Sequence, residues 1–241
     1  MPATLLLCRR VRATVKCALS GDGGDELLGG YNWYTGIQHR AQALADHPQG
    51  WTRHAYAHFL RRCVCSNAEL AQAGLEPYCL PLPAGLDDTP GDAMRMDAAT
   101  FLPSDILRKT DRAAMSCGLE LRAPFLDVDV ANFLLSLPWT MKLGSTGGKH
   151  LLRRAFAHRW PAAIALRPKQ GFGMISGGIM QHPEAAGLVQ AYLHDPNLCI
   201  WNIFPKKWLL RHTQKADGLA WCLLVFSLWC EHTRKTSPFA D

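Results

Sequence analysis

Three carboxylates in a glycine-rich loop are the residues of this sequence best suited to chemistry. Asp22, Asp25 and Glu26 fall within five residues, among glycines at positions 21, 23 and 24. Glycines adopt positive φ readily and let a ligand approach the backbone closely. Mg²⁺ prefers oxygen ligands and usually takes one or two carboxylates together with substrate phosphates, and the amides of such a loop can hold an anion. A solvated Asp-Gly turn is the common alternative, so the loop alone leaves both interpretations open.

A basic loop further along the chain offers the opposite charge. Arg167 and Lys169 flank a proline and precede Gly171, and such a loop can present Lys169 to a phosphate as a compact point charge. Lys149 begins another basic segment, which continues with Arg153. Taken alone, the first pattern is also typical of a basic surface turn, and the second is typical of a solvated helix face.

A third charged cluster begins at Lys109 and ends at Arg122. Its opposite charges lie three or four residues apart, a spacing that usually gives exposed ion pairs on a helix, each worth a few tenths of a kcal/mol. The neighbouring residues 124–126 are apolar. Burial beside them would require every charge to be paired.

Two further patterns resemble sites but are better explained as ordinary structure. His54 and His58 lie one helical turn apart and precede Cys63 and Cys65. Zinc could use these ligand types, but the Cys-x-Cys spacing is poor for it. Residues 176–179 resemble the start of a pyrophosphate-binding loop, yet they lack the Asp and Ser that would follow and do not come after a strand. We predict a turn there.

The elements that must position these residues are mostly helices. Residues 14–19 predict a short buried strand that runs directly into the glycine loop, a usual place for a ligand in α/β folds. Periodicity and breakers predict helices over 3–13, over 36–73 with a break near Pro48, over 97–117, over 130–136 and over 149–160, with a surface loop over 74–92.

Two of these predictions are more specific. We expect the 97–117 helix to be interrupted at Pro103, with Ser104 capping its second part. Residues 219–229 predict a buried helix that is apolar nearly all round. Because parallel strands need neighbours joined by crossovers, a chain that offers one good strand is predicted to be an incomplete α/β sheet domain.

Composition limits the class of protein. The 241 residues suffice for one sizeable domain. The formal charge of +6 is mild and its basic residues are scattered, which disfavours nucleic-acid binding and suits a nucleotide polyphosphate as substrate. Nine cysteines without a CxxC motif predict reduced thiols in the cytoplasm. No apolar run is long enough for a membrane span, and the N-terminal pattern is not that of a signal peptide.

Taken together and in order, these segments resemble the asparagine synthetase family. The resemblance is carried by residues 19–31 (LSGDGGDELLGGY), 109–115 (KTDRAAM), 119–127 (LELRAPFLD), 149–153 (KHLLR), 167–172 (RPKQGF) and the closing pattern over 219–229. Each motif is moderately specific, but five in sequence are hard to reach by chance. The resemblance covers nearly the whole chain.

The family implies a fold and a reaction. The fold would be an incomplete Rossmann-like adenine-nucleotide alpha-hydrolase (PP-loop ATPase) domain, helix-rich with one clear strand. In the reaction, ATP and aspartate form a β-aspartyl adenylate with loss of pyrophosphate, and ammonia made from glutamine then attacks the activated carbonyl. Mg²⁺ and ATP are the implied cofactors. The implied site residues are Ser20, Gly21, Lys149 and Lys169 for ATP and pyrophosphate, Asp25 for Mg²⁺, and Asp22 and Lys169 for catalysis.

The sequence also departs from the family. Asp22 stands where the family often has Glu. The family's glutaminase domain begins with a catalytic cysteine after the initiator methionine, where this chain has Pro2. Its Ser-Gly-Gly-x-Asp-Ser loop would lie upstream of Met1. We therefore expect residues 1–241 to be the C-terminal portion of the synthetase-type domain, which would need the N-terminal half or a separate glutaminase subunit as partner.

The sequence leaves other readings open. The chain could be a non-catalytic remnant or binding module, or a related ligase or cyclase that acts on another acid, as β-lactam synthetase does. Whether it forms a homodimer is also open. The sequence retains Asp25, Lys149 and Lys169 together. This favours the hypothesis of an enzyme, because a non-catalytic remnant has no physical need for all three.

Overall fold

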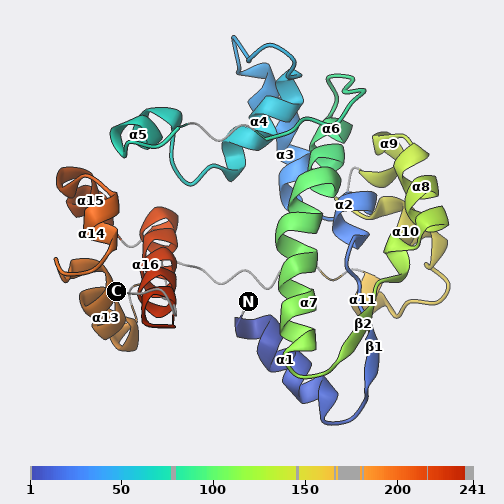
Figure 1. Ribbon diagram of the computed structural model, residues 1–241. Coiled ribbons are helices and arrows are strands. Elements are labelled where there is room, and N and C mark those ends of the chain that lie inside the picture. Colours follow the sequence, from blue (N-terminus) through green and yellow to red (C-terminus); the bar gives the residue numbers. More distant parts are fainter. Residues whose placement is uncertain are drawn as a thin grey trace. The chain divides into compact units, whose positions relative to one another are not determined.

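The structure, a computed structural model, describes two compact units of the chain. The first unit contains residues 1–62 and 80–172, and the second contains residues 63–79 and 173–241. The described residues are 2–76, 80–144, 147–165, 167, 180, 182–215 and 217–236. Helices dominate both units (Figure 1). Within the described residues, no helix is both long and apolar enough to cross a membrane.

A two-stranded parallel sheet lies in the first unit. Strand β1 (Cys17–Leu19) pairs with β2 (Glu120–Arg122) in a register that places Cys17 beside Glu120. The prediction of a strand within 14–19 is confirmed for its last three residues, but the strand is not buried, since Leu19 is 75% exposed. The expectation of one clear strand is also corrected, because β2 is a second one. With three residues and none β-branched, β2 gives almost no periodic signal.

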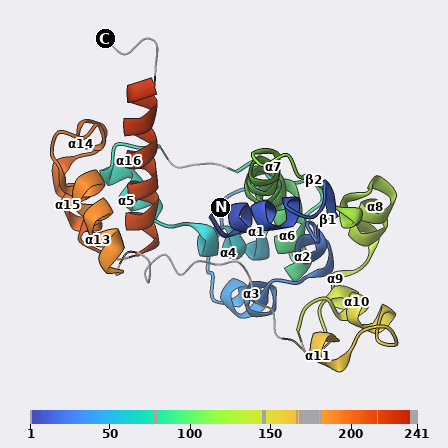
Figure 2. The ribbon, with the colours of Figure 1, turned by 90° about the horizontal axis from the view of Figure 1, so that it is seen from below.

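Helix α1 (Pro2–Arg12) confirms the helix predicted over 3–13 and packs on α7 (Arg108–Met115), as Figure 2 shows. The contact is built around the small side chains of Cys8, Ala113 and Ala114, which are buried in one cluster with Leu119. Small residues let the two helix backbones approach closely. This pairing anchors α7 just before β2.

A continuous helical segment runs through α6 (Pro90–Met96), the π-helix η1 (Asp97–Leu107) and α7. The predicted interruption at Pro103 is wrong, because Pro103 lies inside η1. A π-helix shifts the hydrogen-bond register, and this shift accommodates the missing proline N–H and the bulk of its ring. Ser104 is not a cap; its hydroxyl donates to the carbonyl of Thr100 one turn back. The loop predicted over 74–92 ends earlier than expected, at the start of α6.

The rest of the first unit packs around α6 and the glycine loop. Its remaining elements are α2 (Gly24–Leu28), α3 (Asn32–Gln42), α4 (Arg53–Arg62), the 3-10 helix η2 (Pro124–Leu126), α8 (Val128–Ser136), α9 (Trp139–Lys142), α10 (His150–Ala155) and α11 (Ala162–Ala165). Helices α3, α4 and α6 share a core that includes Tyr34, Ile37 and Met94. Helices α2 and α8 share another through Leu27, Leu28 and Leu134.

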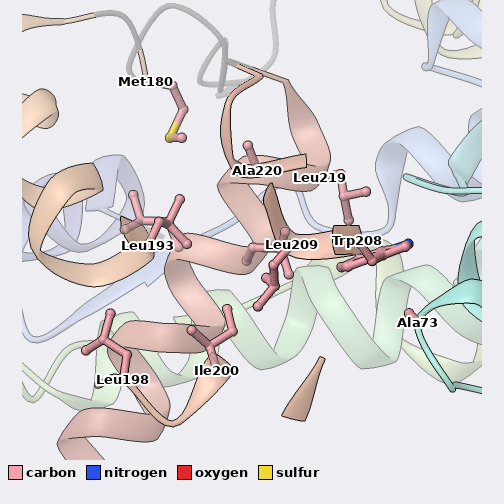
Figure 3. Close-up of a cluster of buried hydrophobic side chains, with 11 residues drawn as sticks. Ala73, Met180, Leu193, Leu198, Ile200, Trp208, Leu209, Leu219 and Ala220 are labelled. Atoms are coloured by element: carbon pink, nitrogen blue, oxygen red, sulfur yellow. The ribbon is translucent and has the colours of Figure 1, made fainter. Parts of the chain in front are cut away.

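The second unit has its own core, drawn in Figure 3. Its elements are α5 (Asn67–Gln72), α13 (Pro183–Val189), η3 (Gln190–His194), α14 (Ile200–Ile203), α15 (Lys206–Thr213) and α16 (Gly218–Thr236). Leu193, Ile200 and Leu209 are fully buried there. The prediction of a helix over 219–229 is confirmed, but it is not buried all round, since Trp229 is 60% exposed.

Candidate functional site

The glycine loop leaves the sheet at the carboxyl end of β1. Because the two strands are parallel, the segment that follows β2 leaves from the same edge, and the Ser20 amide donates to the Arg122 carbonyl there (2.7 Å). In open α/β sheets, ligands bind outside the carboxyl ends of the strands. The pairing therefore brings together two of the segments that carry the candidate chemistry.

Two glycines of the loop, Gly23 and Gly24, pack closely against η2. Gly23 has φ of +82°, and a Cβ at this position would clash with the side chain of Leu126. A Cβ on Gly24 would lie 3.1 Å from Phe125. Between strand and helix, the Asp22 carboxylate accepts a hydrogen bond from the Ser20 hydroxyl (3.0 Å). The loop is thus held in one shape, with Gly21 exposed at its start.

Asp25 and Lys149 meet although the sequence separates them widely. The Lys149 Nζ lies 2.9 Å from Asp25 Oδ1, and their side chains are 29% and 18% exposed. Lys149 has φ of +59°, a left-handed conformation that is costly for a residue with a Cβ. Its amide donates to the Leu28 carbonyl at the end of α2 (3.1 Å). The backbone of Lys149 is therefore fixed by the same helix that carries Asp25.

Gly30 and Gly148 make room for this pair. A Cβ on Gly30 would collide with Asp25 Oδ1 and Lys149 Cε, and a Cβ on Gly148 would collide with the carbonyl of Gly29. Both positions admit only glycine without rearrangement. The two glycines at 29 and 30 thus have different roles: Gly29, with φ of +71°, ends α2, whereas Gly30 permits the approach of Lys149.

This arrangement can hold a metal and a phosphate together. The Asp25 side chain is 18% exposed, and a partly accessible carboxylate is the kind of single protein ligand that Mg²⁺ combines with phosphate oxygens. The Lys149 ammonium lies beside it at the end of a flexible side chain, so it can turn from Asp25 to an incoming phosphate. The donor set therefore fits one Mg²⁺ bound jointly with a polyphosphate.

Glu26 does not join the other two acids of the loop. It is 2% exposed and accepts a hydrogen bond from the Tyr31 hydroxyl at 2.6 Å. Burial raises the pKa of the Glu26 carboxyl, although the Tyr31 hydrogen bond opposes this change. Burial and the same contact raise the pKa of Tyr31. The three carboxylates thus divide, with Asp22 and Asp25 at the loop and Glu26 in the interior.

The other candidate site residues either form ordinary ion pairs or lie outside the described residues. Lys169 and the turn at 176–179 lie outside them, so their predictions stay untested. The cluster that begins at Lys109 forms ordinary ion pairs, one between Lys109 and Asp105 (3.9 Å) and one between Arg122 and Glu120 (2.8 Å), all partly or fully exposed.

The two histidines face different aspartates. His54 contacts Asp88 at 3.0 Å, and His58 Nε2 contacts Asp97 Oδ1 at 2.9 Å. Among the described residues, no group of three or more His, Cys, Asp or Glu side chains is arranged to hold a metal ion.

Asp97 is the centre of a buried polar network that the sequence did not reveal. Its carboxylate is 1% exposed. It accepts hydrogen bonds from the Tyr34 hydroxyl (2.8 Å) and from the Trp33 indole (3.3 Å), and it pairs with Arg62 (3.2 Å) as well as His58. The Arg62 guanidinium also stacks 3.6 Å from the Phe101 ring centre. The only sequence signal was an acid at the start of an apolar helical run.

Comparison with known proteins places this geometry in a family. The asparagine synthase family matches residues 1–231. The chain is 26% identical over 199 residues to asparagine synthetase [glutamine-hydrolyzing] 3 of Bacillus subtilis, covering 78% of this chain and 30% of that protein. It is 30% identical over 201 residues to a putative asparagine synthetase of Mycobacterium bovis, covering 69% of this chain and 31% of that protein. A stretch of 71 residues is 45% identical to the human enzyme.

The chain therefore belongs to the asparagine synthase family, whose domain has the adenine nucleotide alpha hydrolase fold. It spans about a third of the length of the bacterial relatives that it matches.

Proposed function

We propose that this member of the family contributes the back half of an ATP-dependent amide-forming ligase that converts aspartate to asparagine. The observation that carries the proposal is the Asp25–Lys149 pair at the carboxyl edge of the parallel sheet. A partly exposed carboxylate and a cation, held together by two glycines and a left-handed backbone, suit a magnesium polyphosphate. An exposed pair of purely structural purpose would not need such a costly backbone.

In the proposed first step, the β-carboxylate of aspartate attacks the α-phosphorus of ATP. The bond to the bridging oxygen breaks, and pyrophosphate leaves with its electron pair. Ser20 and Gly21 contact the nucleotide, and Lys149 and Lys169 face the pyrophosphate, where fixed cations offset the charge as it develops. Asp25 would hold Mg²⁺, which when bound supplies further neutralisation of that charge.

In the second step, ammonia derived from glutamine attacks the acyl carbon of the β-aspartyl adenylate, and AMP leaves. The nitrogen of the attacking ammonia loses one proton as the amide forms, and a carboxylate near the intermediate can accept that proton. We assign this position to Asp22. Its carboxylate accepts a hydrogen bond from the Ser20 hydroxyl, which fixes its direction at the start of the loop.

The test is aspartate-dependent release of pyrophosphate from ATP and Mg²⁺. The relatives carry further segments outside the matched third, so the assay is run with the chain alone and with the complementary part of a full-length relative. We expect release to require Asp25, Lys149 and Lys169 in the mixture. Lys109→Ala is the matched control, because Lys109 has a comparable exposure but pairs with Asp105 on a helix surface.

The possible outcomes distinguish a catalytic ligase portion from a non-catalytic binding module. Release that is lost in Lys149→Ala and Lys169→Ala but kept in Lys109→Ala supports the proposal. Equal release from all variants would show that the complementary part alone does the chemistry. No release from a folded chain in any mixture would contradict the proposal and favour a non-catalytic binding module.

A second candidate is a related ligase or cyclase that acts on another acid. Asp22 favours it, because its side chain is shorter than the Glu often found in the family and is tied to Ser20. This leaves more space near the reacting carbonyl. Replacing aspartate by glutamate and by larger β-amino acids in the same assay distinguishes the two, since only the second candidate predicts faster release with a larger acid.

A further inference from the structure

A cavity of about 270 Å³ lies in the first unit, and Glu26 of α2 lines it. Helices α2, α6, α9 and the end of α8 contribute to its wall. Asp22, Asp25 and Lys149 do not line it. The residues that matter for its chemistry are Glu26, Asp87, Met94, Arg95, Trp139 and Lys142.

Lys142 is the unusual member of this wall. It is the last residue of α9 and is only 4% exposed. Among the described residues, no carboxylate lies within ion-pair distance of its amine and no hydrogen bond to its side chain is formed. Burying an ammonium without a counter-charge is expensive. A ligand that carries a negative charge would supply the missing counter-charge.

The other charges of the wall are already matched. Arg95 pairs with Asp87 (Nη2 to Oδ2, 2.6 Å), and its guanidinium also donates to the Gly85 carbonyl. Glu26 accepts from Tyr31, and burial favours its protonated form. Burial, and then the charge of Arg95, lower the pKa of the Lys142 amine to about 8. The amine therefore stays largely protonated near neutral pH and is the uncompensated charge of the cavity.

We propose that this cavity binds a small carboxylic acid as its monoanion, with the carboxylate paired to Lys142 and the apolar part of the ligand against Met94 and Trp139. The size agrees, because drug-sized ligands occupy roughly 300–1,000 Å³ and this cavity lies just below that range. Its wall mixes charged side chains with apolar ones such as Met94 and Trp139, which suits a small ligand that has one charged end and one apolar end. The site is independent of the proposed ligase chemistry.

A monoanion fits the wall better than a phosphate does. Lys142 can balance one negative charge, and Arg95 is already paired with Asp87, so a second negative charge on the ligand would find no free cation among the described residues of the wall. The apolar side chains would gain nothing from a phosphate, whereas they gain contact with a hydrocarbon tail. Inorganic phosphate is therefore the anion to use as the competing probe.

The experiment measures binding of butyrate, its neutral analogue butyramide, and inorganic phosphate to the full chain by calorimetry and thermal shift. We expect saturable binding of butyrate with a rise in Tm, and none of butyramide or phosphate. Lys142→Met keeps the length and apolar stem of the side chain, and we expect butyrate to bind it about tenfold to a hundredfold more weakly. Lys109→Met, on the surface of α7, is the matched control and should leave binding unchanged.

Three results would overturn the proposal: butyramide or phosphate binding as well as butyrate, Lys142→Met retaining full affinity, or no butyrate binding at all. Folding does not confuse the test, because removing an unpaired buried charge should raise the Tm of free Lys142→Met. In the unaltered chain, NMR titration of isotope-labelled lysine gives a second measurement. Butyrate should raise the pKa of Lys142, and an unchanged pKa in the presence of bound butyrate would contradict the pairing.

Discussion

Asp97 and Asp25 are the same side chain in two opposite settings of one unit. The Asp97 carboxylate is 1% exposed. It accepts hydrogen bonds from Trp33 and Tyr34 and contacts His58 and Arg62. The Asp25 carboxylate is 18% exposed and meets Lys149, whose own side chain is 29% exposed. The first is surrounded by donors that come from α3 and α4. The second contacts Lys149, whose side chain is also accessible to solvent and to an incoming ligand.

The difference separates a structural carboxylate from a binding one. A buried charge must have all its partners inside the protein, because water cannot replace them. A carboxylate that is to bind a metal must instead keep a partner that can leave. In such a site the energetic cost lies in the backbone conformation, here in the left-handed conformation of Lys149. Exchange of partners is thus built into one site and excluded from the other.

The largest effect should come from Asp97→Asn. The substitution leaves Arg62 and the buried His58 facing a neutral amide, and removing one partner of a buried pair costs about 3–5 kcal/mol of unfolding free energy. Urea unfolding at neutral pH measures it. Asp105→Asn, which weakens the exposed pair with Lys109, should cost less than about 1 kcal/mol. Similar costs for both variants would mean that the Asp97 network contributes little to stability.

Lys149→Gly should have the opposite profile, with a small effect on stability and a large effect on activity. Glycine tolerates the φ of +59° without strain, so the change in unfolding free energy should stay within about 1 kcal/mol. Aspartate-dependent pyrophosphate release in the complemented assay should fall by a factor of about 10²–10³, the usual cost of losing one donor to developing charge. A variant that is both stable and fully active would show that Lys149 has no part in the chemistry.

Lys142 extends the comparison to a buried cation that has no counter-charge among the described residues. Its folded pKa of about 8 lies below the ordinary 10.5, so between these values the unfolded chain binds the proton more readily. Stability should therefore rise with pH across this window, by on the order of 2 kcal/mol, and the penalty should be complete below it. The measurement is the difference in unfolding free energy between the unaltered chain and Lys142→Met at pH 7 and pH 10. A difference that does not change with pH would contradict the lowered pKa.

The smallest effects should come from two glycine substitutions. In Gly36→Ala, a Cβ meets nothing within 4 Å in the middle of α3, so stability should increase by about 0.4–1 kcal/mol with activity unchanged. In Gly30→Ala, the Cβ displaces the ends of the Asp25 and Lys149 side chains. These are movable groups, so we expect little loss of stability but slower pyrophosphate release. Equal behaviour of the two variants in the assay would remove the functional meaning of the close approach at Gly30.

The sequence predicted the glycine loop and the strand before it because both have strong local signals. Carboxylates among glycines after a run of apolar residues are visible without any structure. The helix over 3–13 was equally plain. The break expected at Pro103 failed because the π-helical register depends on neighbours that hold η1 between α6 and α7, and propensity alone does not contain them.

The pairing of Asp25 with Lys149 lay beyond prediction from periodicity. It requires a left-handed residue, and lysine gives no sign of that conformation, which here is fixed by the carbonyl of Leu28. The glycines at 30 and 148 permit the close approach of the backbones, but their presence in the sequence does not say which segments meet. Lys142 was still less visible, because burial of one lysine results from how α8, α9 and α6 enclose it.

Strand β1 has a practical consequence of another kind. Its three residues pair with β2 on one side only within the described part of the chain, and Leu19 is 75% exposed at its end. An open strand edge with an apolar side chain is a template for pairing with another copy, and short strands or edge lysines are the usual protection. The strand is short but has no charge at this position. We therefore expect the purified chain to aggregate as its concentration rises, and Leu19→Lys to keep it in solution.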